Sequence, residues 1–118
     1  MQLSTTNNWI CEANLEMEVQ SPTWKPEKNT IKKLQELWNS LRTIIEPPKK
    51  TSAYMGYKGA HLKASDDREY YTFKDVVTFR NKNMVETRRD RGRRFEKLLL
   101  KSAPQGKIPD TLFMLEFE

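Results

Sequence analysis

The side chains best suited to chemistry in this sequence are one cysteine and one histidine. Cys11 and His61 are the sole residues of their types among 118, so a thiol–imidazole pair would have to use both. Apolar and polar residues alternate from Trp9 to Val19, which predicts a strand whose apolar face carries Cys11. A thiol on such a face is ordinarily an inert packing element, and one histidine with one cysteine cannot complete a zinc site without carboxylates. We therefore expect no catalytic residue, no metal ligand and no cofactor.

Paired acidic residues are the next candidates for chemistry. Glu16 and Glu18 fall on the polar face of the predicted first strand, and Asp66 and Asp67 fall in a polar turn, so solvated charge explains both pairs. The stretch "YMGYKGAH" has two glycines three residues apart and does not match a phosphate-binding loop. A deep pocket lined by His61, tyrosines and an arginine is the observation that would favour an enzyme.

The densest feature of the sequence is basic. Five arginines occupy the seven positions from Arg88 to Arg94, and residues 88–107 contain eight basic residues against two acidic ones. The formal net charge of +5 is therefore concentrated in this segment. We predict a binding surface here, which we call the basic segment, made by Arg88, Arg89, Arg91, Arg93, Arg94, Lys97 and Lys101.

The position of these cations bears on their role. Cations in the first turn of a helix oppose the helix dipole, at a cost of about 0.3 kcal/mol or more each. The glutamates of the predicted first and last strands face away from the helices, so we expect at most one or two arginines of the basic segment to pair with them around an edge of the sheet. We expect the other arginines to face solvent without internal partners. We expect Arg91 and Arg94 in particular to be exposed, which an external anion would explain.

Three functions remain open on this basis. The favoured one is a small non-catalytic binding protein of the adaptor, inhibitor or immunity type, which docks a charged protein partner through the basic segment. The alternative is an RNA- or DNA-binding protein that uses the same arginines, and the third is an enzyme with a cryptic site. For nucleic acid, the side chains available for base stacking would be Tyr54, Tyr57, Tyr70 and Tyr71.

The remaining patterns predict the elements that must position these residues. Apolar residues at three- and four-residue spacing predict a helix of about five turns between Pro26 and the "EPP" at 46–48. Strands are expected over 52–64 and 69–80, with a turn at 81–83 and a returning strand in "MVET". A second helix should begin near Thr87 or Asp90 and end before Pro104, and the alternating tail "TLFMLEFE" predicts a last strand.

These elements predict one α+β domain over residues 1–118. We expect an antiparallel sheet of four or five strands with two helices packed on one face, in the order β-α-β-β(-β)-α-β. A ferredoxin-like winding fits that order. The predicted core is Trp9, Cys11, Leu15, Met17, Leu34, Trp38, Leu41, Phe95, Leu98, Leu99, Phe113 and Leu115.

The start of the chain has neither the basic stretch nor the continuous apolar run of a signal peptide. No segment of the sequence approaches the roughly 20 apolar residues of a membrane-spanning helix. We therefore expect a cytoplasmic protein without membrane contact, whose oligomeric state the sequence does not indicate.

Overall fold

The computed structural model describes residues 8–16, 20–45, 54 and 56–117, and within them the chain forms seven strands and three α-helices. All strands join one antiparallel sheet in the order β2-β1-β4-β5-β6-β7-β3. A short 3-10 turn (Arg91–Arg93) precedes α2. The elements are β1 (Trp9–Leu15), β2 (Thr23–Trp24), α1 (Lys28–Ser40), β3 (Arg42–Thr43), β4 (Tyr57–Ala64), β5 (Arg68–Phe73), β6 (Val76–Asn81), β7 (Met84–Arg89), α2 (Arg94–Lys101) and α3 (Asp110–Phe117).

The α+β class and the antiparallel sheet are confirmed, whereas the predicted numbers of four or five strands and two helices are wrong, since the described residues form seven strands and three α-helices. Two of the additional strands, β2 and β3, are two-residue pairings at the two edges of the sheet. The ferredoxin-like winding is not found, because neighbours from β4 to β7 are joined in sequence order and the expected last strand is a helix.

The first strand forms with the predicted faces but is shorter than the predicted Trp9 to Val19, since β1 ends at Leu15, Glu16 lies in a turn and 17–19 lie outside the described residues. Trp9, Cys11, Ala13 and Leu15 are buried on the helix-covered face of the sheet, while the residues between them face the other way. The predicted core is largely confirmed, since its remaining described members are buried or packed against the buried cluster, with one exception. Leu115 is 55% exposed, and Met17 lies outside the described residues.

The first helix is shorter than predicted. Helix α1 buries Ile31, Leu34 and Trp38 on one side, as the spacing indicated, but it ends at Ser40 rather than near residue 45. Arg42 and Thr43 are extended instead and pair with β7. Thr43, Ile44 and Ile45 are β-branched and favour extended backbone. Pairing with β7 gives the backbone groups of this extended segment their hydrogen-bond partners.

The segment 69–80 was predicted as one strand and forms two. Lys74 and Asp75 turn the chain, with Lys74 at φ 61°, and Phe73 faces Val76 across the hairpin. The turn at 81–83 and the returning strand are confirmed, since Asn81 pairs with Met84.

The tail prediction is also wrong. Residues 110–117 form α3, in which Leu112 and Glu116 are buried one turn apart. The predicted strand would have turned Glu116 to solvent. In the helix its carboxylate points inward, where it accepts a hydrogen bond from the Tyr54 N–H and pairs with Lys74 and Arg93.

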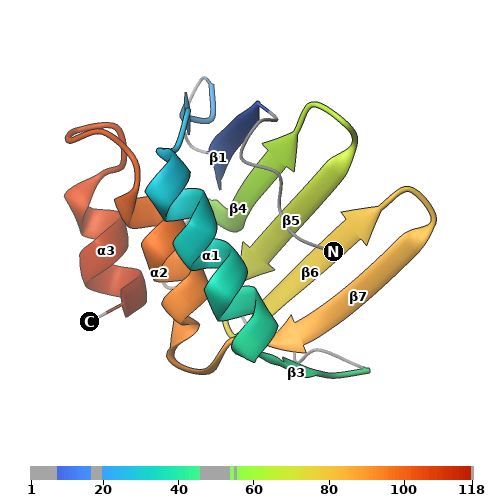
Figure 1. The fold of residues 1–118 in the computed structure, drawn as a ribbon. Helices are drawn as coiled ribbons and strands as arrows, with labels where there is room; N and C mark the ends of the chain where they lie inside the picture. Colours follow the sequence, from blue (N-terminus) through green and yellow to red (C-terminus); the bar gives the residue numbers. More distant parts are fainter. Residues whose placement is uncertain (1–7, 17–19, 46–53, 55, 118) are drawn as a thin grey trace.

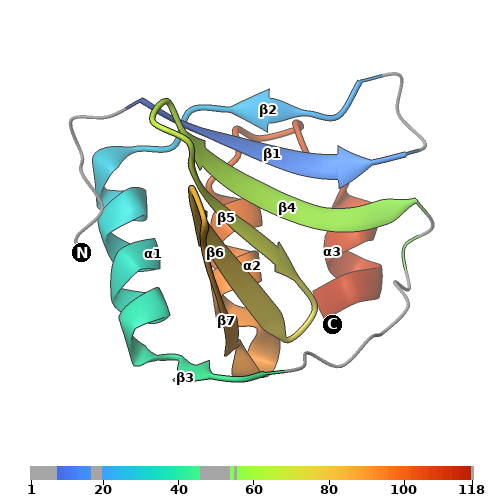
Figure 2. The ribbon, with the colours of Figure 1, turned by 90° about the vertical axis from the view of Figure 1, so that its right-hand side faces the viewer.

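All three helices lie on one side of the sheet, as Figure 1 shows, with α2 between α1 and α3. The view onto the other side shows strands in front of α2, with no helix over them (Figure 2). We call this uncovered side the open face. Within the described part of the chain, no helix has the length and apolar character needed to cross a membrane.

Candidate functional site

The open face of the sheet carries the polar residues of β4, β5 and β6. Strand alternation sends every second side chain to this side. The ladder places His61, Tyr71 and Thr78 in one row across the three strands. In the next row, Lys63 faces Glu69 and Glu69 faces Arg80.

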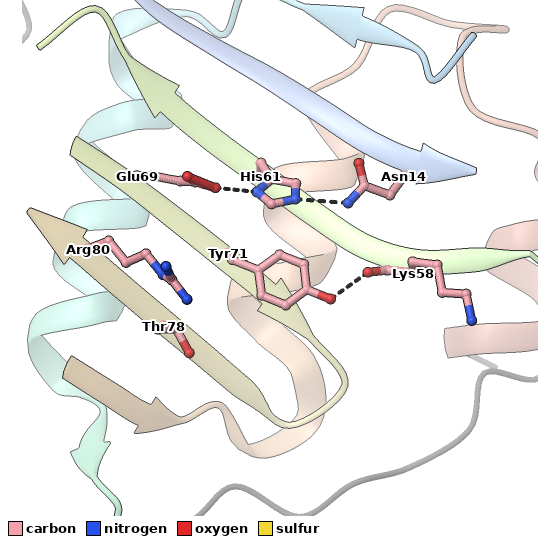
Figure 3. A pocket seen from close by; sticks show the side chains of 7 residues that line it. All are labelled: Asn14, Lys58, His61, Glu69, Tyr71, Thr78 and Arg80. Atoms are coloured by element: carbon pink, nitrogen blue, oxygen red, sulfur yellow. Dashed lines mark hydrogen bonds and ion pairs between the residues drawn. The ribbon is translucent and has the colours of Figure 1, made fainter. Parts of the chain in front are cut away.

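These rows border a hollow of about 640 Å³ (Figure 3). Such a volume lies within the range of small-molecule sites. Its lining comes from β1, β4, β5 and β6 and is polar or aromatic at every position. The lining residues are Asn14, Lys58, His61, Glu69, Tyr71, Thr78 and Arg80.

The floor of the hollow is the ring of Tyr71, which a glycine allows to lie against β4. Gly59 has φ 98°, and a Cβ atom there would lie 2.8 Å from the Tyr71 Oη and 2.9 Å from its Cε1. The Tyr71 hydroxyl donates a hydrogen bond of 2.5 Å to the Lys58 carbonyl oxygen. Burial, with a smaller contribution from Glu96, raises the pKa of Tyr71, so the phenol stays protonated as a donor. The ring is therefore fixed in place, with its broad side visible in Figure 3.

Beside the ring, three polar side chains form a line across β1, β4 and β5. Asn14 Nδ2 lies 2.8 Å from His61 Nε2, and His61 Nδ1 lies 2.5 Å from Glu69 Oε2. The Asn14 amide donates to Nε2, so the imidazole proton is on Nδ1 and is donated to the Glu69 carboxylate. The His61 and Tyr71 ring centroids are 4.7 Å apart. Both imidazole nitrogens are thus engaged within the protein.

The two cations of the hollow are different in this respect. No described residue forms a hydrogen bond or an ion pair with the Arg80 guanidinium or the Lys58 ammonium. Glu69 is the residue opposite Arg80 in the ladder, but its carboxylate is bound to His61. Two unpaired cations therefore border a space that holds one engaged carboxylate.

The basic segment is divided by the structure into internal and external cations. Arg88 is internal: its Nη1 donates to the Trp38 carbonyl oxygen at 2.8 Å, its Nε donates to Glu86 at 2.7 Å, and its guanidinium lies 4.3 Å from the Trp38 ring centroid. The hydrogen bond from Arg88 to the Glu86 carboxylate, together with one from Thr43, lowers the pKa of Glu86. Arg88 is thus one of the arginines with internal partners, but its acid is Glu86 of β7 and not a glutamate of the predicted first or last strand.

Arg93 is the second arginine of the basic segment with internal partners. Its guanidinium donates to both oxygens of the fully buried Glu96, at 2.7 and 3.0 Å, and it pairs with Glu116 at 3.1 Å. Tyr57 also donates its hydroxyl to Glu96. Burial raises the pKa of Glu96, and Arg93 opposes that rise. The pairing with Glu116 does not run around an edge of the sheet, as the sequence suggested, because α3 brings Glu116 to the helix side of the sheet.

The start of α2 also differs from the prediction. Thr87 belongs to β7, and α2 begins at Arg94 after the 3-10 turn. Asp90 is buried, and its carboxylate accepts hydrogen bonds from the N–H groups of Phe95 and Glu96. An acid at this helix start offsets part of the unfavourable effect of the neighbouring cations.

The other cations of the basic segment point outward to different degrees. Arg91 and Arg94 are exposed, as predicted, and so is Lys101. Arg89 and Lys97 are partly buried, and the Lys97 ammonium lies 5.9 Å from the Phe117 ring centroid.

Cys11 takes no part in either cationic region. It is fully buried among the core residues under the helices, and burial raises the pKa of its thiol to about 12. His61 lies on the opposite face of the sheet, so the two residues cannot act as a pair. In the described ranges, no group of three or more histidine, cysteine, aspartate or glutamate side chains could hold a metal ion.

The hollow was not predicted from the sequence, because residues 69–80 were interpreted as one strand. That reading placed Tyr71 and Phe79 on the same side, whereas Tyr71 faces the hollow and Phe79 packs against Tyr70 and Trp38. The signal that could have identified the site was the glycine at residue 59 followed by alternating polar residues.

Comparisons with protein-family models, with curated protein sequences and with solved structures found no match to this chain.

Proposed function

We propose that this chain is a non-catalytic binding protein that holds an anionic ligand in the hollow on its open face. The single observation that carries the proposal is the pair of cations, Arg80 and Lys58, that border the hollow without an ionic partner among the described residues. A cation without a partner stabilises an incoming anion by charge-assisted hydrogen bonds, and arginine can do so with two parallel bonds.

Binding is favoured over catalysis by the state of His61. The hollow does contain a histidine, a tyrosine and an arginine, which is the combination expected of an enzyme in this chain. A general base, however, needs a nitrogen lone pair within reach of the substrate. The Nε2 lone pair of His61 accepts from Asn14 and its Nδ1 proton goes to Glu69, so His61 acts as a bridge that orients two side chains.

A second candidate function is docking of an acidic protein partner through the exposed cations of the basic segment. Its support is the exposure of Arg91, Arg94 and Lys101, which leaves charge available for a partner. Nucleic acid is the alternative partner for this surface, and a steep dependence of binding on salt concentration would identify it. Lys101 lines a smaller hollow of about 170 Å³ together with residues of the loop after α2, compared with about 640 Å³ on the open face, so we rank the basic segment second.

The test compares two charge-matched double variants. Affinity for inorganic phosphate is measured by NMR titration at low salt for the wild type, for R80Q/K58Q and for R91Q/K101Q. Each double variant removes one arginine and one lysine charge, so any difference between them reports position and not net charge. We expect R80Q/K58Q to weaken phosphate binding at least about tenfold, since it removes both charged donors of the hollow, and R91Q/K101Q to retain wild-type affinity.

Equal losses in the two double variants would contradict the proposal, because they would reflect net charge alone. A loss confined to R91Q/K101Q would assign anion binding to the basic segment instead. Thermal melts of all three proteins serve as the control for folding.

A further inference from the structure

We infer that the anionic ligand of the hollow is a nucleotide, with its base stacked on Tyr71 and its phosphate held by Arg80 or Lys58. This inference rests on the proposed function and adds the chemical class of the ligand. An inorganic anion would use the cations of the hollow and leave its aromatic ring without a contact. A ligand with a planar group could use the ring of Tyr71 as well.

The ring of Tyr71 is prepared for stacking before any ligand arrives. Its hydroxyl is tied to the Lys58 carbonyl oxygen, and the absence of a side chain at Gly59 lets the ring lie against the strand. A fixed ring loses little conformational entropy when a second planar group is placed on it. Stacking of a base on an aromatic side chain is largely independent of base identity, because every base has a π face.

The other tyrosines cannot serve this role. Tyr57 and Tyr70 are buried in the core under the helices, and Tyr54 is packed against that core. Of the four tyrosines, Tyr71 alone lines the hollow. One stacking ring matches one base, so the hollow accommodates a single nucleotide unit.

The two cations line the same hollow as the ring. Figure 3 shows Arg80 and Lys58 on opposite sides of the Tyr71 ring, with Thr78 beside it. Thr78 adds a hydroxyl for a sugar or phosphate oxygen, although its Oγ1 also lies 3.3 Å from that of Thr87. The arrangement of a ring between two cations is suited to a molecule that is planar in one part and anionic in another.

The test uses adenosine 5′-monophosphate, adenosine and inorganic phosphate as separate probes, with affinities measured by calorimetry or NMR titration. We expect the monophosphate to bind about tenfold or more tightly than either fragment, because it alone engages the ring and a cation together. The substitution Tyr71→Leu should lower its affinity about tenfold and leave phosphate affinity unchanged. The substitution Tyr71→Phe keeps the ring and should retain most of the binding.

A second measurement needs no substitution. In the wild type, base protons stacked over Tyr71 should shift upfield in the NMR spectrum through the ring current, whereas bound adenosine monophosphate without such shifts would overturn the inference. A monophosphate that binds no better than phosphate would overturn it too. If phosphate still binds and R80Q/K58Q weakens that binding at least about tenfold, the proposed function survives. If no anion binds, both fail.

A short single-stranded oligodeoxyadenylate distinguishes the two sources of the same chemistry. Affinity equal to that of the monophosphate indicates a free nucleotide, as expected for one stacking ring. Much tighter binding that remains sensitive to Tyr71→Leu indicates a nucleotide unit within a single strand. An oligonucleotide whose binding is insensitive to Tyr71→Leu contradicts the inference.

Discussion

Individual cations of this chain differ in whether the protein itself supplies their anion. Arg88 and Arg93 lie in the basic segment, yet both are bonded to internal acceptors. Arg80 stands opposite a glutamate in the sheet and is not bonded to it. Local charge density in the sequence was therefore a poor guide to which cations are available, because availability depends on contacts between distant segments.

The internal role of Arg93 predicts a large effect on stability. The substitution Arg93→Met leaves Glu96 buried without its cation, and breaking a buried pair in this way costs about 3 kcal/mol or more. The substitution Arg91→Met, in the same turn but exposed, should change the free energy of unfolding by about 0.5 kcal/mol or less. Urea denaturation of both variants measures the difference, and similar values for the two would refute the internal role.

The same variant has an expected pH dependence. Burial already raises the pKa of Glu96, and Arg93 opposes the rise, so removing Arg93 raises that pKa further. Protonation of Glu96 then removes the unpaired charge as the pH falls. The cost of Arg93→Met should consequently be smaller at mildly acidic pH than at neutral pH, and a cost independent of pH would speak against this cause.

Cys11 provides a prediction at alkaline pH. An unperturbed thiol ionises near 9.0, but burial raises the pKa of Cys11 to about 12 in the folded protein. Between these values the folded state keeps a proton that the unfolded state has lost, so the free energy of unfolding falls as the pH rises, by up to about 1.4 kcal/mol per pH unit. The variant Cys11→Ala should show a shallower fall in denaturation experiments.

Tyr70, whose pKa burial also raises to about 12, contributes equally to both proteins and cancels in the comparison.

A thiol reagent should label native Cys11 slowly at neutral pH. Rapid labelling without unfolding would mean that Cys11 does not face the core.

Among the elements, β4 does most to shape the hollow, through Gly59. A Cβ atom at Gly59 would lie 2.6 Å from the Thr72 carbonyl oxygen as well as close to Tyr71, and φ is 98°. Gly106 has φ 85° but nothing within 4 Å of a Cβ atom. We expect Gly59→Ala to lower the free energy of unfolding by about 2 kcal/mol more than Gly106→Ala, since both suffer backbone strain and only the first suffers the clash. Equal costs would mean that Tyr71 does not lie against β4.

Elements with a single apolar period were predictable from the sequence, and elements compatible with two periods were not. The alternation of β1 and the stripe of α1 each fit one structure. The tail "TLFMLEF" alternates like a strand, but it also places Leu112 and Glu116 one helical turn apart, and the buried partners Arg93 and Lys74 stabilise the helix. Such partners come from distant segments, so local periodicity could not reveal them.

The candidate site was predictable to a smaller extent than the fold. His61 and Tyr71 were candidates for a site because of their residue types. Arg80 and Lys58 are single cations in strands, and no local sequence pattern around them indicates a site. Their importance comes from the pairing of β4, β5 and β6, which brings them to one face. The turn at Lys74 and Asp75 decides which face each residue of β6 occupies.

At the scale of the whole molecule, the two faces of the sheet differ in what covers them. The three helices cover one face (Figure 1). The core and the buried ionic contacts of Arg93 lie on that face. The open face contributes little to the core, and its lining residues Arg80 and Lys58 have no ionic partner among the described residues. The exposed cations of the basic segment lie at a separate place, around the start of α2 and along it.

The most direct test of the central claim is to locate the bound anion by amide chemical shifts. Adenosine monophosphate is titrated into isotope-labelled wild-type protein, and the perturbed amides are assigned. We expect the largest shifts around Lys58, Tyr71 and Arg80 on β4, β5 and β6, and we expect R80Q/K58Q to weaken the binding that causes them at least about tenfold. Shifts confined to the turn and helix around Arg91 and Arg94, with the open face unchanged, would contradict the claim.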